Sequence, residues 1–170
     1  EIKHDKEKKT INYKHAWLEI YDKPVIYFPK FFHPDPTVKR QSGFLMPQVI
    51  DSTSLGLSFE LPYYKVLSDN KDLTFTPRIF SENEGLFQNE YRQVNENSKH
   101  IADFSLKEKN SSSKTHFFSN SIAKLEIDAF DISEIELNVE LTSDDNYLKT
   151  HNISSSINEN QSLLESFLLF

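Results

Sequence analysis

The sequence predicts an all-β chain that folds as an antiparallel meander. Segments of roughly ten residues alternate between apolar and polar side chains, and polar turns separate them. No apolar stripe persists with the period of a helix. Phenylalanine and tyrosine, which favour strands, are abundant, with 14 and 7 copies among 170 residues. We therefore expect long helices to be absent.

The N-terminal part predicts one strand and then a connector. TINYKHAWLEIYD, residues 10–22, alternates up to Trp17 and then shifts phase at Leu18, which predicts a strand with a bulge. Residues 24–36 hold four of the seven prolines. Proline donates no backbone hydrogen bond, so this stretch predicts an extended connector between two β units. Its apolar residues, such as Phe31 and Phe32, are expected to pack against a neighbouring surface.

The rest of the chain predicts a run of strands. We expect them at about residues 43–51, 55–67, 72–80, 86–95, 100–109, 115–127, 134–142 and 162–170, with a longer loop over 143–161. No apolar run approaches the ~20 residues that a membrane-spanning helix needs.

Alternation divides these strands into two faces. The apolar face is predicted to hold Leu57, Phe59, Leu61, Tyr63, Leu73, Phe75 and Ile79. The opposite face holds Thr74, Thr76 and the charged residues Glu60, Arg78, Glu90 and Arg92. A soluble β-sandwich with the apolar face as its core gives the same pattern as a membrane barrel with that face in lipid. Strand lengths of ~9–11 residues favour the barrel, because soluble strands average ~5–6.

Pro47 and Pro62 lie in the middle of the first two of these strands. Taken alone, they favour edge-strand prolines that prevent aggregation. Pairing the two prolines keeps the apolar residues largely together, since Met46 then lies opposite Tyr63 and Ile50 opposite Phe59, with Gln48 opposite Leu61. We therefore expect Pro47 and Pro62 to be cross-strand neighbours on the polar face.

The next hairpin requires a different register. Placing Pro62 opposite Pro77 would set Leu61 against Arg78 and mix the two faces. We therefore expect Leu61 to lie opposite Pro77 or Ile79, with Pro77 on the apolar face.

Composition and motifs argue against several kinds of site. The formal net charge of −7 argues against a nucleic-acid partner, and the absence of cysteine rules out disulfides and thiolate metal sites within these residues. The six histidines lack metal-ligand spacing. Glu60 and Glu90 could form a carboxylate pair, but Arg78 and Arg92 on the same face favour a lattice of ion pairs. We predict no catalytic residue, metal site or cofactor.

Two long segments resemble the LPS-assembly protein family (LptD, also called organic solvent tolerance protein). They read KPVIYFPKFFHPDPTVKRQSGFLMPQ and GLSFELPYYKVLSDNKDLTFTPRIFSENEGLFQNEYR. Family members carry a P-V-x-Y-x-P connector, then a basic residue and S/T-G-F-L-x-P, then V/L-P-Y-Y, D-x-T-x-T-P-R and a strand ending in E-Y/F-R. All of these motifs stand here in that order, over residues 17–92, and LTSDDNYLKTH fits a later family strand more loosely.

The resemblance implies a fold and a division into domains. Residues 1–23 would end a periplasmic β-jellyroll, residues 24–40 would be a Pro-rich linker, and residues 41–170 would be the first strands of a large outer-membrane β-barrel. The first and last residues of the chain predict that it is a fragment of such a protein.

The resemblance also implies a function without catalysis: lipopolysaccharide transport and insertion into the outer leaflet of the outer membrane. The partners would be lipopolysaccharide, the plug lipoprotein of the translocon and a periplasmic LPS-bridge protein that meets the jellyroll. The family has two prolines in its lateral gate, and they match Pro47 and Pro62, so the resemblance implies that these two residues form part of a gate. It also implies that Glu60, Arg78, Glu90 and Arg92 face the lumen of the barrel. A soluble or secreted β-sandwich binding module is the alternative.

Overall fold

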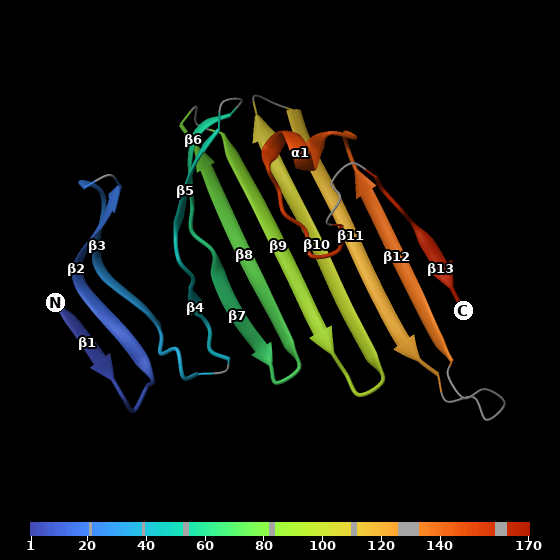
Figure 1. The fold of residues 1–170 in the computed structure, drawn as a ribbon, viewed down its shortest axis with the longest axis horizontal. Coiled ribbons are helices and arrows are strands. Elements are labelled where there is room, and N and C mark those ends of the chain that lie inside the picture. Colours follow the sequence, from blue (N-terminus) through green and yellow to red (C-terminus); the bar gives the residue numbers. More distant parts are fainter. Residues whose placement is uncertain are drawn as a thin grey trace.

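The computed structural model describes residues 1–20, 22–38, 40–52, 55–81, 84–109, 112–125, 133–158 and 163–170. These residues form two antiparallel sheets, one of three strands and one of ten (Figure 1). The predicted all-β antiparallel fold is confirmed. Residues 53–54, 82–83, 110–111 and 128–132, which belong to expected turns, and residues 126–127, the expected end of a strand, lie outside the described residues.

The small sheet is built from the first 34 residues. Its strands are β1 (Ile2–Asp5), β2 (Thr10–Ile20) and β3 (Lys23–Pro34), in the order β1-β2-β3. The expected irregularity in β2 is confirmed, because its register with β3 shifts between Leu18 and Glu19. His15 also has a left-handed backbone, with φ of 53°.

The expectation of a connector over residues 24–36 is corrected for residues 24–34, which belong to strand β3. β3 pairs with β2 along its length and, among the described residues, with no strand on its other side. Its prolines are tolerated because an edge strand needs only the backbone donors that face its one partner. The connection between the sheets is therefore residues 35–42.

Asp35 stabilises the start of this connection. Its carboxylate accepts hydrogen bonds from the Thr37 backbone N–H at 2.8 Å and from the Thr37 hydroxyl at 2.7 Å, and it contacts His4. The two bonds from Thr37 hold the pKa of Asp35 below its usual value.

The large sheet contains the remaining strands. They are β4 (Gly43–Phe44), β5 (Gln48–Ser52), β6 (Gly56–Glu60), β7 (Tyr63–Ser68), β8 (Lys71–Phe80), β9 (Gly85–Val94), β10 (Ser98–Lys109), β11 (Ser112–Lys124), β12 (Glu134–Thr142) and β13 (Phe167–Leu169). Their order is β13-β12-β11-β10-β9-β8-β6-β5, with β7 also on β8 and β4 on β7. The last expected strand is shorter than predicted, because β13 covers only 167–169; residues 159–162 lie outside the described part.

The sheet exposes its apolar face. Phe59 lies opposite Ile79 and Tyr63 opposite Phe75, so the predicted grouping of these residues on one face is confirmed. The same face continues across the sheet, and many of its side chains are more than a third exposed: Leu57, Phe75, Ile79, Phe87, Phe104, Leu106, Phe117, Leu137, Leu141 and Leu168.

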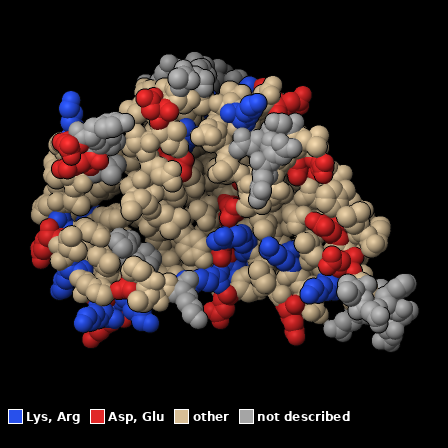
Figure 2. Space-filling model, viewed as in Figure 1, with Lys and Arg blue, Asp and Glu red and all other residues tan. Residues whose placement is uncertain are grey.

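The polar face is the covered one. Residues 143–158, expected as a loop, contain the short helix α1 (Tyr147–His151) and then a segment, here called the strap (152–158), that folds back over β8–β11 (Figure 1). Tyr147, Leu148 and Ile153 pack with apolar side chains of the sheet, Phe80, Leu86 and Phe118. In Figure 2, which has the same view, basic and acidic side chains alternate along the lower rim of the molecule.

No helix among the described residues is both long enough and apolar enough to cross a membrane.

Candidate functional site

The first two expected strands of the large sheet are each broken at a proline. Between β4 and β5 lie residues 45–47, which end at Pro47, and between β6 and β7 lie residues 61–62, which end at Pro62. The Leu45 N–H donates to the Pro62 carbonyl at 2.9 Å. In an antiparallel pair the reciprocal bond would come from an N–H at position 62, which proline lacks. Pro62 therefore removes a donor between the first and the second strand.

The expected register of this first hairpin is wrong by one residue. Gln48 lies opposite Glu60 instead of Leu61, and Ile50 lies opposite Ser58 instead of Phe59. The cause is the turn between the two strands: Ser52 pairs with Gly56, so three residues connect β5 to β6, whereas the expected register requires a two-residue turn. The two breaks also differ in length, three residues against two as in a β-bulge, so the β4–β7 register is one residue out of step with the β5–β6 register. The expectation that Pro47 and Pro62 are cross-strand neighbours on the polar face is therefore wrong: Pro62 pairs with Leu45, and Gln48 rather than Pro47 lies opposite the polar-face residue Glu60.

The expected register of the second hairpin is confirmed. The Leu61 N–H donates to the Pro77 carbonyl at 3.2 Å, so these residues are opposite each other. Pro77 in turn lies opposite Phe87, on the apolar face, as predicted.

The structure brings the four predicted charged residues together on the polar face. Glu60 lies opposite Arg78. Arg78 is only 2% exposed; its Nε donates to Ser58 Oγ and its Nη1 to the carbonyl of His151, both at 2.9 Å. The strap reaches the same group, because Ser156 donates to a carboxylate oxygen of Glu90 at 2.7 Å.

A polar cavity of about 400 Å³ lies between these residues and the strap. Glu60, Arg78 and Glu90 line it from the sheet, and residues 152–156 line it from the other side. The Nη2 of Arg78 is buried and has no hydrogen-bond partner within the described residues. A polar cavity with a donor that has no partner is suited to a hydrated ligand rather than to an apolar one.

One group that sequence reasoning missed has the composition of a hydrolase triad. His116 Nδ1 lies 2.7 Å from Ser105 Oγ, and His116 Nε2 lies 3.3 Å from a carboxylate oxygen of Asp103. All three are at most 1% exposed, and the Tyr147 hydroxyl contacts Ser105 Oγ at 2.9 Å. A buried serine beneath a tyrosine has no room for a substrate, so this group serves to dock α1 on the sheet. Only the β10–β11 register, which pairs Ser105 with His116, could have revealed it.

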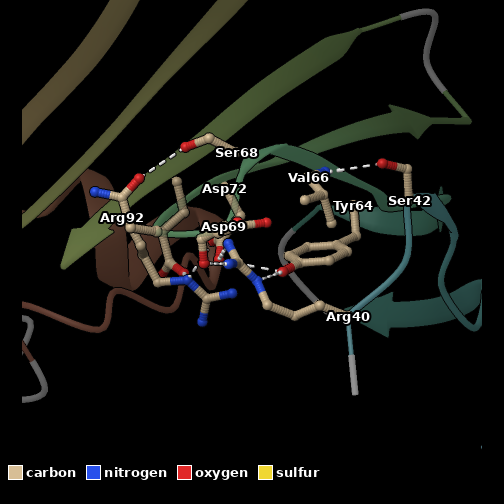
Figure 3. A network of polar contacts seen from close by, with 10 residues as sticks. Arg40, Ser42, Tyr64, Val66, Ser68, Asp69, Asp72 and Arg92 are labelled. Atoms are coloured by element: carbon tan, nitrogen blue, oxygen red, sulfur yellow. Dashed lines mark hydrogen bonds and ion pairs between the residues drawn. The ribbon is translucent and has the colours of Figure 1, made fainter. Parts of the chain in front are cut away.

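A second missed group joins the connection to the sheet (Figure 3). The Arg40 guanidinium donates to the Tyr64 hydroxyl at 3.1 Å, to Asp72 Oδ2 at 2.8 Å and to the carbonyl of Asp69. Arg92 donates to the other oxygen of Asp72 at 2.8 Å. The basic residue before S-G-F-L-x-P and the aspartate of D-x-T-x-T-P-R were visible as motif positions, but their contact was not.

Comparison with known proteins finds relatives that share one name. The family profile described as LptD protein matches residues 11–166. The LPS-assembly protein LptD of Pseudoalteromonas atlantica is 31% identical over 138 residues, which is 79% of this chain and 18% of that protein. The proteins of the same name from Yersinia enterocolitica and Saccharophagus degradans are 40% and 37% identical over 95 residues, covering 55% and 56% of this chain and 12% and 11% of their own lengths.

Proposed function

The chain belongs to the LptD protein family, and we propose that it contributes to the transport of lipopolysaccharide and its insertion into the outer leaflet of the outer membrane. The chain spans 18% or less of the length of these relatives. We infer that it supplies the part of the translocon where a periplasmic domain meets the first strands of the barrel.

The observation that carries this proposal is the inverted burial of the large sheet. Charged and polar side chains such as Arg78, Asp103 and His116 are buried, while Ile79 and Leu141 on the other face are 61% and 59% exposed. In a soluble sandwich the apolar face would be the core. In a membrane barrel it faces lipid and the polar face lines the lumen. The exposed apolar face therefore supports the barrel over a soluble binding module.

The two sheets fit the two compartments of such a translocon. We assign the small sheet to the end of the periplasmic jellyroll, where the LPS-bridge protein would deliver the lipid. We assign residues 41–170 to the barrel, with Glu60, Arg78, Glu90 and Arg92 towards the lumen and the plug lipoprotein. The polar lumen provides the sugar chain of lipopolysaccharide with a hydrated path, and the acyl chains leave through the wall.

The broken strands give that exit a physical basis. A ladder that lacks donors at Pro47 and Pro62 loses roughly 0.5–1.5 kcal/mol of net stabilisation per missing bond. If the first strand also forms the seam at which the barrel closes, the weak point lies where the wall has to open. We propose that Pro47 and Pro62 weaken the hydrogen bonding of the first strand and of its neighbour, and that this allows the seam to open as a lateral gate. We infer no catalytic step.

Two experiments test the proposal on the full-length protein. Depleting it from cells should lower the lipopolysaccharide detected by antibody on intact cells relative to the total in lysates; an unchanged ratio would overturn the transport function. For the barrel, cysteines placed at Ile79 and at Thr74, on opposite faces of β8, can be probed with a bilayer-restricted thiol reagent. We expect labelling at 79 and not at 74. Equal labelling, or labelling of neither, would contradict the barrel.

A further inference from the structure

The base of the first strand is held to its neighbours by side chains as well as by the β ladder. Arg40, at the end of the connection between the sheets, reaches Tyr64 on β7, Asp69 in the turn and Asp72 on β8. Two residues later, Ser42 Oγ accepts a hydrogen bond from the Val66 N–H of β7 at 2.9 Å. These bonds tie the entry of the first strand to the second and third strands (Figure 3).

Asp72 is the centre of this attachment. It is 9% exposed and has both carboxylate oxygens occupied: Oδ2 accepts from Arg40 and from Tyr64 at 2.8 and 3.1 Å, and Oδ1 accepts from Arg92 at 2.8 Å. Bonds between ionised partners in a partly buried site are stronger than exposed ones. Because Arg92 stands on β9, the group spans from the connection to the fourth strand of the meander.

The attachment lies where the strand pairing needs support. The donor that Pro62 lacks would face Leu45, so this proline weakens the contact between the first and second strands and not the closing seam itself. The part of the first strand before the break, β4, has only two residues in register with β7. With so short a ladder, the first strand could separate from the second when the wall opens.

We propose that Arg40 and Asp72 are positioning residues for the gate, which keep the base of the first strand on β7 and β8 while the seam opens along the other edge of that strand. This proposal rests on the proposed lateral gate. Opening then separates the first strand from the closing strand only, and the first strand stays paired with the second.

Reversible cross-links in the full-length protein test which edge opens. Phe44 and Tyr63 lie directly opposite each other on β4 and β7, and Tyr91 and Ala102 lie opposite each other on β9 and β10 as a control pair. We expect F44C/Y63C, when oxidised, to leave surface lipopolysaccharide unchanged, because these strands stay together. A loss of surface lipopolysaccharide that a reductant reverses would overturn the proposal.

A second experiment removes the attachment of the first strand to β7 and β8. We expect Arg40→Ala to lower by several fold the concentration of a large hydrophobic antibiotic that stops growth, at an unchanged amount of folded barrel. Adding F44C/Y63C should restore the barrier under oxidation and lose it with reductant, while Y91C/A102C should not restore it. An unchanged barrier in Arg40→Ala, or equal rescue by both cross-links, would overturn the proposal. Failure of the gate itself shows separately, in the proline variants described below.

Discussion

The backbone N–H of Leu61 donates to the carbonyl of Pro77, and this bond determines the faces on which the neighbouring prolines lie. Pro77 shares the apolar face with Phe75 and Ile79. Pro62 follows Leu61 and is level with Thr76, on the opposite face, where it is buried. Pro62 and Pro77, in adjacent strands, thus lie on different faces of the sheet, and Pro77 can serve as a control when Pro62 is replaced.

The first prediction concerns the gate. Replacing Pro47 and Pro62 together with alanine restores two backbone donors, each worth roughly 0.5–1.5 kcal/mol net when bonded. The stiffer wall should slow lipopolysaccharide insertion. We expect less lipopolysaccharide on intact cells and greater sensitivity to large hydrophobic antibiotics in cells with this variant as their sole copy.

Pro77→Ala is the control for that experiment. It also restores a donor, the one that would face the Leu61 carbonyl, but between the second and third strands, away from the seam. We expect cells with this variant to resemble the wild type. Equal sensitivity for the double variant and for Pro77→Ala would contradict the gate, as would a double variant without any effect.

The second prediction concerns depth in the membrane. Phe104 and His100 lie on the same face of β10, opposite Asn89 and Gln93 of β9, but His100 is near the end of the strand. A lysine on the lipid face is expected to destabilise the barrel by about 2–4 kcal/mol at mid-depth and by about 0–1 near the interface. Phe104→Lys should therefore lower the denaturant midpoint of the full-length barrel in lipid far more than His100→Lys. Similar midpoints for both variants would show that this face does not contact lipid.

Alternation was enough to predict much of this fold. Strand residues alternate strictly between faces, so Phe59, Phe75 and Ile79 could be placed together without any long-range information. The same rule, with the need to keep Leu61 away from Arg78, limited the partner of Leu61 to Pro77 or Ile79, and the structure has Pro77. The covering of the polar face was not predictable, since α1 and the strap lie in a polar segment whose contacts are distant in sequence.

Two errors had a local physical cause. The register at Gln48 depends on the length of the turn between β5 and β6, and the polar residues there do not show whether two or three of them connect the strands. Residues 24–34 have the composition of a connector, but their three prolines are accommodated on the edge strand β3. The cluster around Asp72 shows the same limit, because Arg40 reaches it only after the chain has entered the sheet.

The third prediction concerns a buried ion pair. Lys107 Nζ lies 2.7 Å from a carboxylate oxygen of Glu84, their side chains are 7% and 9% exposed, and the ammonium stands over the Phe80 ring. Glu84→Gln removes the charge partner of a buried cation, which is expected to lower the free energy of unfolding by about 3–5 kcal/mol. Glu84→Gln with Lys107→Met should recover most of this loss. The temperature at which the folded band disappears from an SDS gel measures both, and equal values for the single variant and the wild type would contradict the prediction.

The fourth prediction concerns pH and the docking of α1. His151 is 4% exposed, its Nδ1 donates to the Tyr147 carbonyl at 2.8 Å, and it lies in the field of Lys107, Lys114 and Glu84. Burial lowers the pKa of His151 below its ordinary value of 6.5; the bond to Tyr147 opposes this shift, and the two lysines add to it. The docked state therefore binds fewer protons than the undocked one. Its stabilisation is complete above about pH 6.5 and is lost as the pH falls from there through the pKa of the docked state.

Hydrogen exchange can follow this loss residue by residue. The Ile153 N–H donates to the Leu148 carbonyl at 2.9 Å, so its protection reports docking directly. After correction for the intrinsic pH dependence of exchange, we expect protection over residues 147–158 to fall between about pH 7.5 and pH 5 in the full-length protein, on either side of the ordinary histidine pKa. His151→Gln has no titrating group and should lose this pH dependence, whatever its absolute protection. If the variant showed the same fall as the wild type, a different group would control the docking of α1.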